Sequence, residues 1–302
     1  MNIEIIEVGP RDGLQSEPDV IPTHLKLALI ARLVYAGLRR IEVASFVNPR
    51  RVPQMADAEA VLAGLDRRDD VRFVGLVLNR KGFERALAAG CSEIGMVTAA
   101  TDSFGRRNQG AGIDETIRAW DEIAPLAHAA GVRAQVTISV AFGCPFEGEV
   151  APQRVVDIAK RLAVAMPLEI GIADTIGVAV PSQVSELIDR IKQALPSVPL
   201  RCHFHNTRNT AVANAYAAVL AGVTRLDASV GGIGGCPFAP NATGNVATED
   251  LVYMLSRAGF DTGIDLEKLI NAAHWLQEQR GRAVPSMVSK AGSFPKTISG
   301  VA

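Results

Sequence analysis

The chain has 302 residues, of which 48% are hydrophobic and 27 are glycine, as expected for a globular enzyme with a substantial buried core. A net charge of −1 gives no reason to expect nucleic acid or an anionic membrane as a partner, and no apolar run of about 18 residues predicts a membrane span. The start lacks a signal-peptide pattern and the four scattered cysteines form no CxxC pair, which together favour a reducing, cytoplasmic location.

Short β-branched runs alternate with longer amphipathic stretches along the whole chain. The runs predict strands at 3–8, 40–44, 72–78, 93–97, 133–140, 168–172, 200–204 and 225–229. The stretches predict helices that include 24–36, 113–130, 151–165, 182–194 and 210–221. Most of the strand runs are almost continuously apolar, as in parallel strands that are buried on both faces. Eight strands, each followed by a helix or a helix-sized connection, indicate a closed parallel (β/α)8 TIM barrel.

An open, doubly wound sheet is the alternative architecture. It would normally carry a GxGxxG turn after its first strand, whereas this chain has GPRDG at 9–13, so the barrel is favoured. Two more helical patterns, 249–257 and 266–279, follow the eighth strand, and no linker or repeat interrupts the chain. We therefore expect one catalytic domain over 1–302, with additional helices at about 246–285.

Polar residues follow several predicted strands, at the end of a parallel barrel where active sites form. Asp12 follows the first strand, and Asn245 ends a glycine-rich stretch after the eighth. His203 and His205 end the seventh strand, where a spacing of two residues places both side chains on one face. One carboxylate, two imidazoles and an amide oxygen, without thiolate, suit Mg²⁺ or Mn²⁺, with Zn²⁺ or Co²⁺ possible. Open positions on such an ion would let it act on substrate oxygens as a Lewis acid.

For other polar residues, a purely structural role is an alternative to a role in function. An isolated Arg-Asp pair such as that at Arg11 is usually a surface turn, and Glu42 inside an apolar strand is costly to bury unless it forms an ion pair. Asp174, after the sixth strand, is either an acid that faces a ligand or a helix N-cap. The glycine-rich stretch at 231–245 could be a phosphate cradle, an active-site lid or a disordered connection. Cys236 within it favours a working loop.

In combination, these motifs resemble those of the hydroxymethylglutaryl-CoA (HMG-CoA) lyase family, within the barrel superfamily of metal-dependent lyases and Claisen-type synthases. The motifs are GPRDGLQ at 9–15, SFV at 45–47, VPQM at 52–55, DTIGV at 174–178, HxH at 203–205 and the block from GGCP to GNxATED at 234–250. The likeness runs from residue 1 to about residue 273.

The resemblance assigns roles to individual side chains. The metal ligands that it implies are Asp12, His203, His205 and Asn245, in agreement with the set above. The catalytic residues that it implies are Arg11, Asp12, Glu42, Asp174, His203 and Cys236. The residues that it implies for binding substrate or CoA are Gln15, Ser45, Arg106, Asn108, Thr175 and Arg208. A homodimer or higher homo-oligomer is expected on the same ground.

The reaction implied is the cleavage of HMG-CoA to acetyl-CoA and acetoacetate, as in leucine degradation and ketone-body formation. A metal ion would acidify the C3 hydroxyl and the C2–C3 bond would break to leave the enolate of acetyl-CoA. The Arg11 guanidinium would meet the negative charge on the thioester oxygen. His203 or Cys236 could then protonate the enolate, with Cys236 carried in by closure of its loop.

Two departures from the lyase pattern leave the acyl-CoA substrate open. After the second histidine the family usually has Asp-Thr-Tyr-Gly, whereas this chain has NTRN at 206–209, where Arg208 could pair with a substrate carboxylate or be a solvated helix-start residue. The basic residues around Arg106 keep only part of the family pattern, although they could attract CoA phosphates. The alternatives are therefore citramalyl-CoA or a longer-branched 3-hydroxyglutaryl-CoA. A Claisen-type synthase, whose Gly-x-Gly-Glu-Arg motif is replaced by GGCP at 234–237, and a non-catalytic metal-bearing barrel are less favoured.

Overall fold

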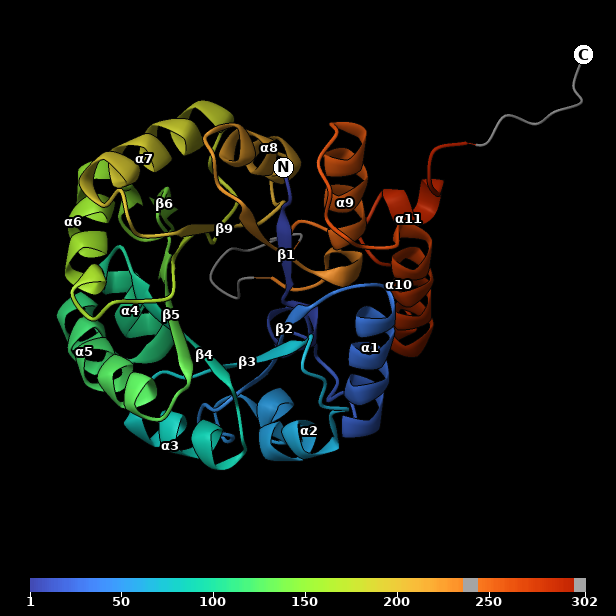
Figure 1. The fold of residues 1–302 in the computed structure, drawn as a ribbon, viewed down its shortest axis with the longest axis horizontal. Helices are drawn as coiled ribbons and strands as arrows, with labels where there is room; N and C mark the ends of the chain where they lie inside the picture. The colour runs from blue at the N-terminus through green and yellow to red at the C-terminus, as the bar shows by residue number, and fades with distance from the viewer. Residues whose placement is uncertain (236–243, 296–302) are drawn as a thin grey trace, which may run out of the picture.

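The computed structural model describes residues 1–235 and 244–295. Among these residues, eight parallel strands close into a barrel in the order β1-β10-β9-β8-β5-β4-β3-β2 (Figure 1). They are β1 (Glu4–Glu7), β2 (Arg40–Ser45), β3 (Arg72–Leu76), β4 (Glu93–Ala99), β5 (Arg133–Ser139), β8 (Ile170–Asp174), β9 (Leu200–Phe204) and β10 (Arg225–Ala228). The predicted TIM barrel is confirmed, and each predicted strand overlaps an observed one.

Helices surround the barrel as an outer ring (Figure 1). They are α1 (Thr23–Tyr35), α2 (Ala58–Gly64), α3 (Arg80–Ala88), α4 (Asp102–Gln109), α5 (Ile113–Ala129), α6 (Pro152–Ala163), α7 (Pro181–Ala194) and α8 (Ala211–Leu220). Their apolar residues recur at helical spacing, as in α5, which buries Ile117, Trp120 and Ile123 against the strands. A small hairpin of β6 (Gly143–Cys144) and β7 (Gly148–Glu149) follows β5, and the strand pattern of the sequence did not predict it.

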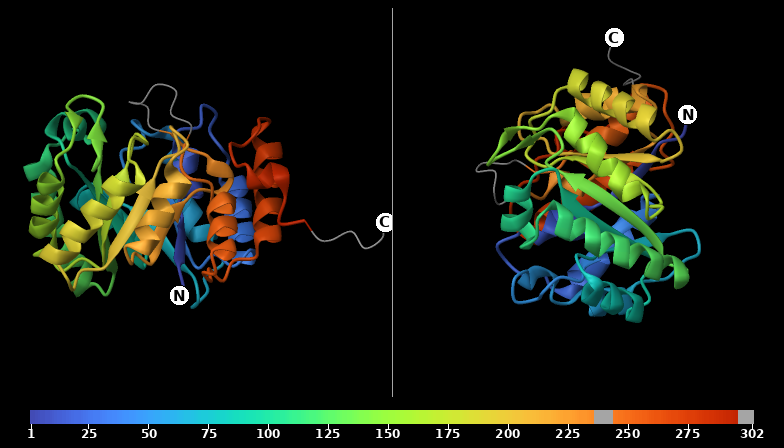
Figure 2. Two further views of the ribbon diagram at one scale, coloured as in Figure 1. Left: turned by 90° about the horizontal axis from the view of Figure 1, so that it is seen from above. Right: turned by 90° about the vertical axis from the view of Figure 1, so that its left-hand side faces the viewer.

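Three further helices follow the last barrel strand, where additional helices were predicted. They are α9 (Thr248–Arg257), α10 (Leu266–Arg280) and α11 (Val288–Ala291). They lie together on one side of the barrel, with α10 against α1 (Figures 1 and 2). No helix in the described part of the chain is long and apolar enough to cross a membrane.

The inside of the barrel is charged near the N-terminal ends of the strands. Arg40 donates through Nε to Glu93 at 2.8 Å and through Nη2 to Glu169 at 2.7 Å, and Arg201 Nε lies 3.2 Å from Glu169 Oε1. All four side chains are buried. Because buried charges are tolerated when they are paired and hydrogen-bonded, this ionic layer takes the place of apolar side chains.

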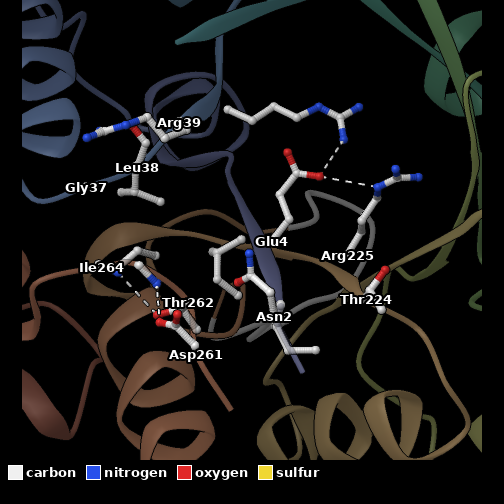
Figure 3. A pocket seen from close by; sticks show the side chains of 14 residues that line it. Asn2, Glu4, Gly37, Leu38, Arg39, Thr224, Arg225, Asp261, Thr262 and Ile264 are labelled. Atoms are coloured by element: carbon white, nitrogen blue, oxygen red, sulfur yellow. Dashed lines mark hydrogen bonds and ion pairs between the residues drawn. The ribbon is translucent and has the colours of Figure 1, made fainter. Parts of the chain in front are cut away.

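A cavity of about 590 Å³ opens below this layer, at the N-terminal end of the barrel (Figure 3). Glu4 and Arg225 project into it and form an ion pair of 3.3 Å between Glu4 Oε2 and Arg225 Nε. The described residues with predicted catalytic roles lie in or just after the strands, toward the opposite end of the barrel, which is the functional face of such barrels.

Candidate active site

A tight turn at the end of β1 positions the first two site residues. The backbone N–H groups of Arg11, Asp12 and Gly13 all donate to the carbonyl of Val8, at 3.2, 2.7 and 3.2 Å, so that residues Gly9–Gly13 form one π-helical turn. A Cβ atom at Gly13 would lie 2.7 Å from a side-chain carbon of Ile233, so any larger residue there would force the Ile233 side chain to move. Single π-helical turns occur frequently at functional sites.

The predicted metal ligands come together although they are far apart in sequence. One ligand atom each from Asp12, His203 and His205 lies within 4.8 Å of the other two. The backbone of His205 pairs with that of Asn245 in an antiparallel bridge, which brings Asn245 to the same place. Its amide Nδ2 donates to Asp12 Oδ2 at 2.9 Å and to the carbonyl of Ile233 at 3.1 Å.

The donor atoms at this cluster fit a divalent cation. Asn245 Oδ1 and His205 Nδ1 are buried and have no hydrogen-bond partner among the described residues. Such orphaned acceptors are costly unless something binds to them. Together with a carboxylate and a second imidazole, they form a mixed oxygen and nitrogen set for Mg²⁺, Mn²⁺ or Zn²⁺.

Arg11 is held beside this cluster by two carboxylates. Its Nε donates to Glu42 Oε1 at 2.6 Å and its Nη1 donates to Asp12 Oδ1 at 2.7 Å. Burial opposes the charge of Asp12, but the Arg11 guanidinium and the two imidazoles outweigh it, and the pKa of the carboxyl lies well below its usual range. The ion pair that the sequence left as the structural alternative for Glu42 therefore exists, and it lies at the site itself.

The two imidazoles differ in their surroundings. Burial and the neighbouring His203 lower the pKa of His205 to about 3, so this ring is neutral and can bind a cation through a lone pair. Burial also disfavours the charged form of His203, but its hydrogen bond to Asp227 outweighs this and raises the pKa. Asp227, in β10, was missed by the sequence analysis, although a single acid in a short apolar strand is the signal that identified Glu42.

Three predicted site residues form hydrogen bonds with backbone groups of the segments that follow β5 and β8. The Asp174 carboxylate accepts hydrogen bonds from the N–H groups of Val178 at 2.9 Å and Ala179 at 3.0 Å, which lie before the N-cap of α7, so Asp174 is not the N-cap of that helix. Thr175 Oγ1 accepts from the N–H of Val140 at 2.8 Å. Arg208 Nη1 donates to the carbonyls of Ile176 and Gly177, and a cavity of about 280 Å³ beside it also borders Asn245.

The remaining predicted residues fall into three groups. Ser45 Oγ and Gln15 Oε1 are buried and have no hydrogen-bond partner in the described chain, as expected of groups that face a ligand. Arg106 and Asn108 lie on α4 and are exposed, with Arg106 Nη1 placed 3.3 Å from Glu115. Cys236 lies outside the described residues.

Two further buried acids support the site and were also missed. Glu7 accepts hydrogen bonds from the N–H groups of Gly9 and Val230, both at 2.8 Å, and from the hydroxyl of Thr248 at 2.7 Å. It thereby joins the turn that carries Arg11 to the start of the glycine-rich stretch and to α9. Burial raises the pKa of Glu7 to about 7. Glu249 similarly accepts from the N–H of Gly231 at 2.9 Å.

Comparisons with known proteins identify the family of the chain. The model of the HMGL-like family matches residues 2–276. The chain is 45% identical to (R)-citramalyl-CoA lyase of Chloroflexus aurantiacus, over 98% of this chain and 97% of that protein. It is 42% identical to hydroxymethylglutaryl-CoA lyase of Pseudomonas mevalonii, over 93% of each. The structure of an HMG-CoA lyase from A. baumannii, in complex with coenzyme A and 3-methylmalate, superposes with a TM-score of 0.93 at 37% identity, over 100% of this chain and 97% of that one.

Proposed function

Because the chain belongs to the HMGL-like family, we propose that this carbon–carbon lyase cleaves HMG-CoA to acetyl-CoA and acetoacetate with the help of a divalent cation. The observation that carries the proposal is the convergence of Asp12, His203 and His205 within 4.8 Å, next to Asn245 and the fixed guanidinium of Arg11. A cation held by these residues supplies Lewis acidity toward the oxygens of the substrate.

Arg11 carries the electrostatic part of the reaction. When the C2–C3 bond breaks, its electron pair passes into the thioester and negative charge develops on the thioester oxygen. The guanidinium is cationic at any working pH, and Glu42 and Asp12 hold two of its nitrogens in place. A charge that is fixed before the reaction stabilises the enolate without any cost of reorganisation.

The proton balance of the reaction needs a base that accepts one proton and an acid that returns one. The C3 hydroxyl loses one proton when its carbon becomes a ketone, and the methyl carbon of acetyl-CoA gains one. His203 and Cys236 are the predicted candidates for the acid that protonates the enolate. His203 lies in the cluster, whereas the assignment of Cys236 stays a prediction because it falls outside the described residues.

A second candidate substrate is (R)-citramalyl-CoA, which the same bond cleavage would convert to acetyl-CoA and pyruvate. The 45% identity to the citramalyl-CoA lyase over 98% of this chain favours it. Its carboxylate is attached directly to C3, whereas HMG-CoA has one more methylene in between. Arg208 donates to two backbone carbonyls and lines a cavity that also borders Asn245, which supports the proposal that Arg208 pairs with the substrate carboxylate, whose position differs between the two thioesters. The longer-branched 3-hydroxyglutaryl-CoA remains a third candidate.

Turnover of a small panel of CoA thioesters tests the proposal. Purified enzyme is stripped with a chelator, reloaded with Mg²⁺, Mn²⁺, Zn²⁺ or Co²⁺, and supplied with HMG-CoA or (R)-citramalyl-CoA, while acetyl-CoA and the keto acid are quantified. We expect acetyl-CoA together with acetoacetate, and loss of activity in chelator that the metal reverses. Cleavage of citramalyl-CoA alone would replace the substrate and keep the reaction class. Full activity in chelator, or no cleavage of any thioester, would refute the proposal.

Several broader expectations stay predictions: Mg²⁺ or Mn²⁺ as the cellular ion, a homodimer or higher homo-oligomer, a cytoplasmic location and a role in leucine degradation or ketone-body formation. The exposed Arg106 and Asn108 on α4 stay proposed contacts for CoA.

A further inference from the structure

A carboxylate from the neighbouring strand contacts one of the proposed metal ligands. Asp227 and His203 lie directly opposite each other in the register of β10 and β9. Asp227 Oδ2 lies 3.1 Å from His203 Nδ1, and the Asp227 side chain is only 5% exposed. Because an ionised carboxylate can only accept, the nitrogen in this contact must carry the proton.

Arg201 keeps this carboxylate ionised and oriented. Arg201 Nη1 donates to both oxygens of Asp227, at 2.8 and 3.0 Å, and the guanidinium is 3% exposed. Arg201 Nη2 donates to Thr137 Oγ1 at 2.8 Å, and its Nε lies 3.2 Å from Glu169. These contacts fix the guanidinium of Arg201, so it cannot turn away from Asp227.

We propose that Asp227, held by Arg201, is a positioning residue that fixes the tautomer of His203 and turns its Nε2 lone pair toward Asp12 and His205. In a neutral imidazole only one nitrogen carries a proton, so a donated Nδ1–H leaves Nε2 free to bind a cation. A carboxylate behind a ligating histidine also makes the histidine a stronger ligand. This inference rests on the proposed metal site and adds that charged side chains inside the barrel set the tautomer and the ligand strength of His203.

The wild-type protein without metal gives the first test. Two-bond ¹H–¹⁵N correlation spectra at alkaline pH, where the ring is neutral, distinguish a protonated Nδ1 from a protonated Nε2. The signal of His203 is identified by its absence in His203→Gln. We expect the Nδ1–H tautomer for His203. The Nε2–H tautomer would overturn the proposal, and this measurement needs no change at Asp227.

Asp227→Asn gives the second test. Arg201 Nη1 lies nearer to Oδ1, at 2.8 Å, than to Oδ2, at 3.0 Å, so we expect the amide oxygen at the Oδ1 position and the amide nitrogen at the Oδ2 position, where it would donate to His203 Nδ1. The ring would then carry its proton on Nε2, where the cation must bind. We expect the Nε2–H tautomer in the metal-free variant, and an increase of about 10- to 100-fold in the dissociation constant for Mn²⁺, measured by titration.

Glu4→Gln is the matched control. Glu4 lies at the open end of the same charged interior, contacts Arg40 at 3.6 Å and Arg225 at 3.3 Å, and is 42% exposed (Figure 3). The same exchange of carboxylate for amide there should leave the Mn²⁺ dissociation constant within about twofold, because exposed ion pairs contribute little.

The outcomes separate this inference from the proposed function. Unchanged Mn²⁺ affinity in Asp227→Asn, or an equal loss in Glu4→Gln, would overturn the positioning role while leaving a wild-type lyase intact. Wild-type protein that keeps the Nδ1–H tautomer and binds Mn²⁺, yet cleaves no CoA thioester, would instead refute the proposed function and leave this inference standing.

Discussion

A substitution at Gly177 offers a direct way to displace His205, one of the proposed metal ligands, without changing any proposed ligand residue. It follows Asp174 in the loop after β8 and has a positive φ of +61°, which side chains rarely adopt. A Cβ atom there would lie 2.8 Å from the carbonyl oxygen of His205 and 2.9 Å from the amide nitrogen of Thr207. These are backbone atoms, so in Gly177→Ala the segment that carries His205 must move.

Gly281 provides the matched comparison, because its φ of +64° is almost the same and a Cβ atom there would meet nothing within 4 Å. Gly281→Ala should therefore cost only the left-handed backbone strain, about 1 kcal/mol after allowance for the stiffer unfolded chain. Gly177→Ala adds a steric conflict of about 1–3 kcal/mol, for a total of about 2–4 kcal/mol in the free energy of unfolding. A shift of a few tenths of an ångström at His205 should also weaken metal binding by about tenfold or more.

Urea unfolding of the two metal-free variants measures the stability difference, and titration with Mn²⁺ measures the affinity. We expect Gly281→Ala to bind Mn²⁺ like the wild type and Gly177→Ala to bind it more weakly and to turn over more slowly. Equal metal affinity in the two variants would show that the close packing of this loop on the backbone of His205 does not set the position of the ligand.

Two further predictions concern the Arg11 guanidinium and the buried acid Glu249. Arg11→Gln should lower kcat by about a thousandfold, because the positive charge that stabilises the enolate is lost. Steady-state kinetics with saturating metal measures this effect, and near-normal turnover would refute the role of Arg11. Burial raises the pKa of Glu249 to about 8, so the folded state binds this proton more tightly than the unfolded chain and stability declines as pH rises from about 4.5 to about 8. The glutamine in Glu249→Gln cannot titrate, so the free energy of unfolding of this variant, taken relative to that of the wild type, should rise by on the order of 3 kcal/mol between about pH 5 and pH 9. Urea unfolding at several pH values measures this difference. If the difference between the two proteins does not change with pH, Glu249 is not the origin of the pH dependence.

The strands and the outer helices could be predicted because each is encoded within its own segment. The run at 3–8 is apolar enough to indicate a strand by itself, and α5 shows its buried face at helical spacing. The ionic layer could not be predicted in this way. Arg40, Glu93 and Arg201 lie in three different strands and Glu169 immediately precedes a fourth, and only the register of the closed barrel decides which of these charges form ion pairs.

In the candidate site too, features set by neighbouring residues in sequence could be predicted, whereas contacts between distant segments could not. The spacing of His203 and His205 and the acid after β1 were enough to predict a metal cluster. The partners of these residues were not evident, because Asp227 reaches His203 only through the pairing of two strands. The direction of a long side chain is also invisible in sequence: Arg208 was left between two roles, and its guanidinium contacts the backbone of a neighbouring loop.

The placement of Asp12 and Asn245 has a consequence for how the enzyme matures. The turn with Asp12 follows β1, and β1 gains its partner β10 only after the segments between these two strands have been synthesised. Asn245 comes later still, so a nascent or truncated chain that ends before it lacks one of the four proposed ligands and holds the ion less tightly. Binding of the ion would therefore indicate that the barrel has closed, and the bound ion would link the turn after β1 to the segment after β10.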